Sequence, residues 1–79
     1  MDIAEIYLLR NIRNISTHEL NGLIVSTQIQ IDNFLRSAKS KEPDFIRDYY
    51  NLEQRYLSSS IIQMASINEI NFRTPAILN

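Results

Sequence analysis

One histidine and three carboxylates come closest to an acid–base or metal site. His18 is the single histidine of the 79 residues, so a proton-shuttling pair is impossible and a metal site would need mostly carboxylates. Asp44, Asp48 and Glu53 could pair, but acids near the start of a helix also offset the positive end of its dipole. We therefore interpret His18 as an exposed helix-start residue and the three acids as solvated, and expect no catalytic residue, cofactor or metal.

The remaining composition also argues against an enzyme. The chain has no cysteine, and it contains no Gly-rich phosphate loop, Ser/His/Asp set or metal-ligand spacing. Eight Lys and Arg are interspersed with nine Asp and Glu, for a net charge of −1, so no basic stripe is present to bind nucleic acid.

Asp2 and Glu5 stand where a secretory signal would carry basic residues, and no apolar run approaches the ~20 residues that span a bilayer. We expect a cytoplasmic protein without membrane insertion.

The helix-breaking residues are few and divide the chain into long periodic segments. One glycine, Gly22, and two prolines, Pro43 and Pro75, are present. Pro43 lies in the polar stretch Ser40–Asp44, and proline fits the first turn of a helix because it has no amide proton to lose. With 44% hydrophobic residues, residues 1–79 are predicted to form one all-α domain, an antiparallel helical hairpin with its turn at Ser40–Asp44.

Apolar residues at three-then-four spacing predict one buried face on the first long helix. This inner stripe consists of Leu20, Leu23, Ile24, Thr27, Ile31, Phe34, Leu35 and Ala38. Upstream, isoleucines and Leu9 also recur at helical spacing between Ile3 and Ile15, but Ser16 and Glu19 have the spacing of a capping box that could start a new helix. The N-terminal segment is therefore expected to be kinked or a separate helix, with the break near Asn14 to Ser16.

The segment after Pro43 carries apolar residues on two neighbouring faces. One face contains Phe45, Tyr49, Leu52 and Tyr56, and the other contains Ile46, Tyr50, Leu57, Ile61 and Met64. The helical pattern ends near Asn71, and Pro75 disfavours helix at the residue before it, so residues 72–79 are predicted to be a loose tail.

Two further features allow a structural and a functional interpretation. Ser58–Ser60 and Ser66 could admit a closely packed helix, or could form a solvated patch that weakens the helix. The tyrosines could be core residues or contacts to a partner, because each combines a large apolar area with a polar tip.

The second apolar face is the main argument for a protein partner. A two-helix hairpin needs one apolar face per helix, yet Val25 and Ile29 lie off the inner stripe and the last helix has a whole additional face. These residues must pack on the folded-back N-terminal segment, on an identical subunit or on a different protein. We predict that the partner-binding residues are Tyr50, Leu57, Ile61 and Met64.

The sequence resembles the small co-chaperone subunits of type III secretion needle complexes, the YscE/SsaE-like family. The shared features are the stretch from Ser16 to Val25, the Phe34–Leu35 pair, the turn from Lys41 to Asp44, and a second helix that ends in Ser58 to Ile62. The resemblance implies a hairpin that binds a tetratricopeptide-repeat (TPR) chaperone and keeps the needle subunit unpolymerised. It transfers no individual binding residue.

Two alternatives stay open on the sequence. A needle subunit is also a hairpin with a proline-containing turn and a Tyr-rich second helix, but its second helix runs to the chain end, where Pro75 intervenes here. A small helical inhibitor or regulator that binds an enzyme is the other alternative. For the purified chain, homodimerisation through the additional apolar face is expected.

Overall fold

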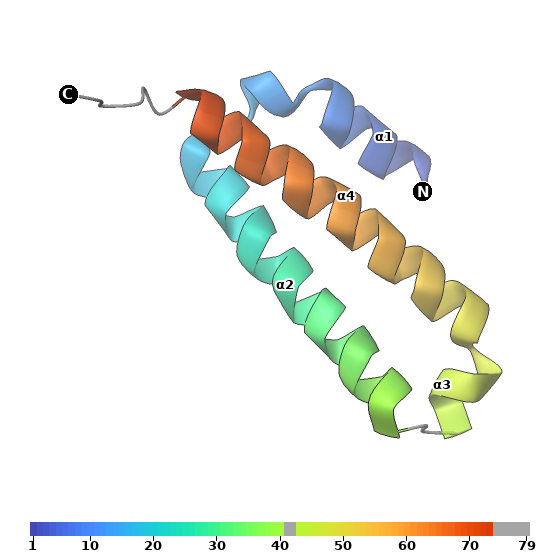
Figure 1. Cartoon of the computed structure of the whole chain (residues 1–79). Coiled ribbons are helices and arrows are strands. Elements are labelled where there is room, and N and C mark those ends of the chain that lie inside the picture. Colours follow the sequence, from blue (N-terminus) through green and yellow to red (C-terminus); the bar gives the residue numbers. More distant parts are fainter. Residues whose placement is uncertain (41–42, 74–79) are drawn as a thin grey trace.

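The computed structural model describes residues 1–40 and 43–73, apart from the side chains of Asp44 and Phe45. In these ranges the chain is helical and contains no strand. The elements are α1 (Ile3–Arg10), the 3-10 turn η1 (Ile12–Asn14), α2 (Thr17–Ser40), α3 (Pro43–Arg47) and α4 (Tyr49–Arg73). Helices α2 and α4 pack against each other as an antiparallel hairpin (Figure 1), which confirms the predicted fold class.

The N-terminal segment is a separate helix; a capping box starts α1, and the Ser16 side chain caps the start of α2. Asp2 accepts a hydrogen bond from the Glu5 amide (2.9 Å), while the Glu5 side chain accepts one from the Asp2 amide (2.9 Å). At the start of α2, the Glu19 amide donates to the Ser16 hydroxyl (3.1 Å). The predicted break near Asn14 to Ser16 is therefore confirmed, because η1 ends at Asn14 and α2 begins at Thr17.

Two boundaries differ from the sequence prediction. The segment after Pro43 is interrupted at Asp48, so a five-residue α3 precedes α4. At the other end, α4 continues through Phe72 and Arg73, which we expected to begin the loose tail. The remainder of that predicted tail, residues 74–79, lies outside the described residues, as do positions 41 and 42 of the predicted turn.

The seam between α2 and α4 is built mainly from small polar side chains. Among the described residues only Leu20 and Ile62 are buried apolar side chains, with 0% and 7% exposure. The other buried positions are Thr27, Ser58, Ser59 and Ser66. Short side chains allow two helix axes to approach closely, and Ser59 lies against α2, where its hydroxyl reaches Gln30 (3.0 Å).

The inner stripe of α2 was predicted correctly except at one position. Leu35 is 51% exposed, whereas Leu20 and Thr27 are buried and the other members are partly covered. On α4, Tyr49 is 46% exposed although it was placed on the same face as Leu52 and Tyr56. The phenyl ring of Phe34 stacks on Tyr56, with ring centroids 4.7 Å apart, and this pair closes the hairpin near α3.

Hydrogen bonds between side chains fix the alignment of the two long helices. The Ser59 hydroxyl donates to Gln30 Oε1 (3.0 Å), and Gln63 Nε2 donates to Gln28 Oε1 (2.8 Å). Within α2, the buried Thr27 hydroxyl bonds to the Leu23 carbonyl oxygen (2.6 Å). The two bonds between the helices favour one register, because a shift of α4 along α2 would break both of them.

Ser66 is the exception, because its buried hydroxyl has no hydrogen-bond partner. We expect Ser66→Ala to raise the free energy of unfolding by about 1 kcal/mol, since an unsatisfied buried hydroxyl is penalised and alanine is the better helix former. Thermal unfolding followed by circular dichroism measures this. Ser59→Ala is the matched control and should destabilise, because it breaks the bond to Gln30; a Ser66→Ala variant with a lowered melting temperature would contradict the prediction.

Arg73 joins the C-terminal end of α4 to the N-terminal turn. Its guanidinium donates to Glu69 Oε2 (2.9 Å), to the Thr17 hydroxyl (3.2 Å) and to the carbonyl oxygens of Ile12 and Arg13 (3.1 Å each). Arg13 in turn lies over the ring of Phe72, 5.6 Å from its centroid. These bonds hold η1 and the first turn of α2 against the end of α4.

Arg73→Ala should lower the free energy of unfolding by about 1–2 kcal/mol, because several charge-assisted hydrogen bonds are lost at a largely covered site. Urea unfolding measures the change. Arg55→Ala is the control, since Arg55 is an exposed residue on the same helix; equal effects of the two substitutions would show that the Arg73 bonds contribute nothing.

The three longer helices form a single layer. The molecule extends 51 × 31 × 15 Å, so one dimension is close to the diameter of a helix. Helix α4 lies between its two neighbours, with α2 along one side and α1 along the other (Figure 1). Stable domains usually pack two layers of secondary structure around a core, and residues 1–40 and 43–73 supply one.

Candidate protein-protein interface

The four residues predicted to bind a partner lie along one exposed face of α4. Tyr50, Leu57, Ile61 and Met64 follow each other at intervals of seven, four and three residues, which places them on one side of the helix. Their exposed fractions are 71%, 45%, 48% and 64%. We call these four residues the outer stripe.

The folded-back N-terminal segment leaves the outer stripe uncovered. Helix α1 packs on α4. The folded-back N-terminal segment was one of the three surfaces on which the additional apolar face was expected to pack. The four outer-stripe residues nevertheless stay exposed, whereas Ser58 and Ile62 on the same helix are buried and Ala65 and Glu69 are partly covered. The outer stripe therefore still lacks an intramolecular partner within the described part of the chain.

The middle of the hairpin carries no charged side chain, a feature that the sequence reasoning did not use. On α4, residues 56–68 contain no Asp, Glu, Lys or Arg, and the same holds for residues 20–31 on α2. Charged residues are depleted at the centres of protein interfaces, because burying a charge without a partner is costly. Three members of the outer stripe lie inside this uncharged segment, and the absence of charge could have been read from the sequence.

Apolar exposure extends beyond the outer stripe. Ile46 on α3 is 66% exposed, and Val25 and Ile29 on α2 are 61% and 55% exposed, as expected for residues off the inner stripe. Single exposed apolar residues are ordinary on protein surfaces. The outer stripe differs because Leu57, Ile61 and Met64 occupy successive turns of one helix face, with Tyr50 two turns before them.

The four tyrosines divide into different environments. Tyr50 and Tyr7 are exposed, at 71% and 69%, whereas Tyr56 stacks on Phe34 inside the hairpin. Tyr49 is partly exposed, and its hydroxyl donates to Glu53 Oε2 (2.7 Å). Tyr50 is therefore the tyrosine of the outer stripe that offers both ring and hydroxyl to a partner.

The pKa of the Tyr49 phenol is raised above its ordinary value of 10.0. The largest cause is the hydrogen bond that the phenol donates to Glu53, followed by repulsion between the Glu53 carboxylate and the phenolate, and then by desolvation. The interaction favours the folded state below pH 10, and this contribution is lost as the pH rises through the folded-state pKa. We expect Glu53→Gln to lower that pKa. Absorbance titration at 295 nm follows phenolate formation, and a curve unchanged by Glu53→Gln would contradict this assignment.

The residues considered for chemistry do not come together. His18 is exposed in the first turn of α2, between the cap residue Ser16 and Glu19, whose amide donates to the Ser16 hydroxyl. Asp48 forms an exposed ion pair with Arg47 (3.7 Å), and Glu53 binds Tyr49, while the Asp44 side chain lies outside the described residues. Within residues 1–40 and 43–73, no three metal-ligating side chains form a group that could hold an ion.

None of the described helices is long and apolar enough to cross a membrane. Comparison of the chain with protein-family models, curated proteins and solved structures gives no significant match. The surface chemistry of the helices is therefore the basis for the function proposed below.

Proposed function

We propose that this chain is a cytoplasmic co-chaperone subunit of a bacterial type III secretion system. Its outer stripe would bind a TPR-type chaperone, and the resulting complex would keep the needle subunit unpolymerised before export. The activity would be sequestration, with no catalysis and no cofactor. The resemblance to the YscE/SsaE-like family motivates the choice among helical binding proteins.

The observation that carries the proposal is the exposed outer stripe on a fold of one layer. The hairpin buries only Leu20 and Ile62 among its described apolar residues, and four large apolar side chains remain exposed in a row. A partner helix that packs on Tyr50, Leu57, Ile61 and Met64 would supply the missing layer. Each well-buried side chain of this size contributes about 1.5–3 kcal/mol.

Sequestration follows from simple competition. A polymerising subunit assembles through an amphipathic helix, and a helical groove that covers this helix removes the assembly surface. The small subunit would contribute by binding the folded groove protein and thereby stabilising it by mass action. Without its partner, the purified chain is expected to homodimerise through the outer stripe.

Affinity purification of the tagged chain from cells that express it naturally, followed by mass spectrometry, tests the proposal. A TPR protein and a needle subunit in stoichiometric amounts are expected with the wild-type chain. Both should be lost with Ile61→Asp and retained with Ile29→Asp, a matched exposed isoleucine on α2. Filaments of the chain itself would instead indicate a needle subunit, and stoichiometric capture of an unrelated enzyme would indicate an inhibitor.

A further inference from the structure

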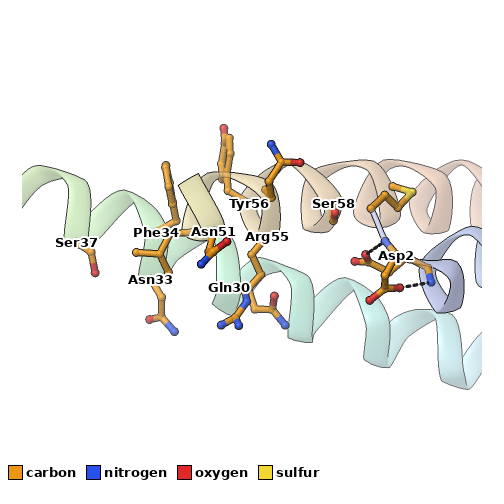
Figure 2. A pocket seen from close by; sticks show the side chains of 13 residues that line it. Asp2, Gln30, Asn33, Phe34, Ser37, Asn51, Arg55, Tyr56 and Ser58 are labelled. Atoms are coloured by element: carbon orange, nitrogen blue, oxygen red, sulfur yellow. Dashed lines mark hydrogen bonds between the residues drawn. The ribbon is translucent and has the colours of Figure 1, made fainter. Parts of the chain in front are cut away.

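A polar groove lies between α2 and α4 in the half of the hairpin next to α3, and it extends to the start of α1. Its volume is about 730 Å³. Gln30 and Asn33 line it from α2, Arg55 lines it from α4, and Asp2 and Glu5 line it at the start of α1 (Figure 2). None of the outer-stripe residues lines this groove. It is therefore a second surface, separate from the one on which the proposed function depends.

The middle of the groove presents hydrogen-bond donors that lack a partner. Arg55 forms no hydrogen bond or ion pair within the described part of the chain. Gln30 Oε1 already accepts a bond from the Ser59 hydroxyl (3.0 Å), and Asn33 Oδ1 accepts one from the Arg36 guanidinium (2.6 Å). The NH₂ groups of both carboxamides therefore remain available to donate. A guanidinium and two amide donors in one stretch of groove suit a carboxylate, which only accepts hydrogen bonds.

The two ends of the groove differ in character from its middle. At the α1 end, Asp2 and Glu5 each use one carboxylate oxygen in the capping box, and the other oxygen of each has no partner in the described residues. Toward α3, the stacked rings of Phe34 and Tyr56 line the groove together with Leu52. From α1 to α3 the groove thus offers negative charge, then cationic and amide donors, then apolar surface (Figure 2).

We propose that this groove binds an extended peptide segment of a partner protein, with an acidic residue in its middle, a basic residue toward α1 and an apolar residue toward α3. Every second side chain of an extended chain points to the same side, about 6.6–6.8 Å apart, so three alternate residues meet the three stretches of the groove. Charge complementarity sets their order. The acidic side chain accepts bonds from Arg55 and the two carboxamides, and the basic one binds the free oxygens of Asp2 and Glu5.

The probes are two acetylated and amidated heptapeptides, GKAEALG and GLAEAKG, which carry the three side chains at alternate positions in either chain direction. One of them, added to the ¹⁵N-labelled full chain at up to about 10 mM, should shift the amide signals of residues 30–37 and 51–58. Replacing its glutamate by glutamine should weaken binding at least about tenfold, because charge-assisted bonds are lost. Arg55→Gln in the chain should weaken the glutamate peptide by a similar factor and leave binding of the glutamine peptide unchanged.

Arg10→Gln is the matched control, since Arg10 is an exposed arginine on α1 that does not line the groove. This variant should bind the peptide as the wild-type chain does, and circular dichroism confirms that each variant is helical. The inference is overturned if neither peptide shifts these signals, or if Arg55→Gln leaves the affinity for the glutamate peptide unchanged. Equal shifts with sodium acetate at the same concentration would also overturn it, because the groove would then bind any small carboxylate. Ile61→Asp should leave peptide binding intact, so this inference and the proposed function can fail separately.

Discussion

Leu57→Asp and Ile61→Asp are each expected to abolish the partner complex while leaving the isolated chain helical. Both side chains lie on the outer stripe inside the uncharged segment 56–68, where a partner would exclude water. A carboxylate buried there without a counter-charge costs about 3 kcal/mol or more, which corresponds to at least about a hundredfold in Kd. In the free chain the same carboxylate stays hydrated, because each position is close to half exposed.

Titration of the purified partner by isothermal calorimetry, with circular dichroism of each variant, separates binding from folding. Ile29→Asp is the matched control, since Ile29 is 55% exposed on the uncharged segment of α2 but lies outside the outer stripe. Retained affinity in both outer-stripe variants would remove this surface from consideration. Loss of affinity with Ile29→Asp alone would move the interface to α2.

The fold could be predicted from the sequence because its signals are local. Pro43 marks the turn, Ser16 and Glu19 mark the start of α2, and the three-then-four spacing marks the helices. Each of these depends on residues within one or two turns of each other. The structure places a helix end or a cap at each of these positions.

The packing could not be predicted in the same way, because it depends on residues far apart in the sequence. Ser58, Ser59 and Ser66 are buried, and Ser59 bonds to Gln30 of α2, although their polarity suggested solvent exposure as readily as burial. Leu35 was assigned to the inner stripe by spacing alone and is half exposed, because the stripe is wider than the seam needs. Three of the four bonds of Arg73 span 56 to 61 positions and leave no periodic pattern.

The candidate interface could be predicted in part: its residues follow from local spacing, but their exposure depends on long-range packing. Spacing was sufficient to identify Tyr50, Leu57, Ile61 and Met64 as one helix face, and the exposure of that face follows from the position of α1. Sequence periodicity left three destinations for these residues. Helix α1 packs on α4 but leaves these residues exposed in the described part of the chain, and our proposal takes another protein as the covering surface.

Leu20→Ala is expected to have the largest effect on stability. Leu20 is fully buried at the start of α2 and is one of two buried apolar side chains among the described residues. Truncating a buried leucine costs about 3–5 kcal/mol, because transfer energy is lost and a cavity remains. Since a chain of this size has a free energy of unfolding of about 4–12 kcal/mol, the substitution removes a large share of it.

Urea unfolding of the two variants Leu20→Ala and Leu35→Ala compares the loss of unfolding free energy at a buried and at an exposed leucine of the same helix. Leu35 is 51% exposed, so its truncation should cost less than about 1 kcal/mol. Equal losses would mean that Leu35 belongs to the core, as its spacing first indicated.

A partner at a hundred times its Kd should restore about 2.7 kcal/mol to the Leu20→Ala chain, because the missing second layer then stabilises the hairpin from outside.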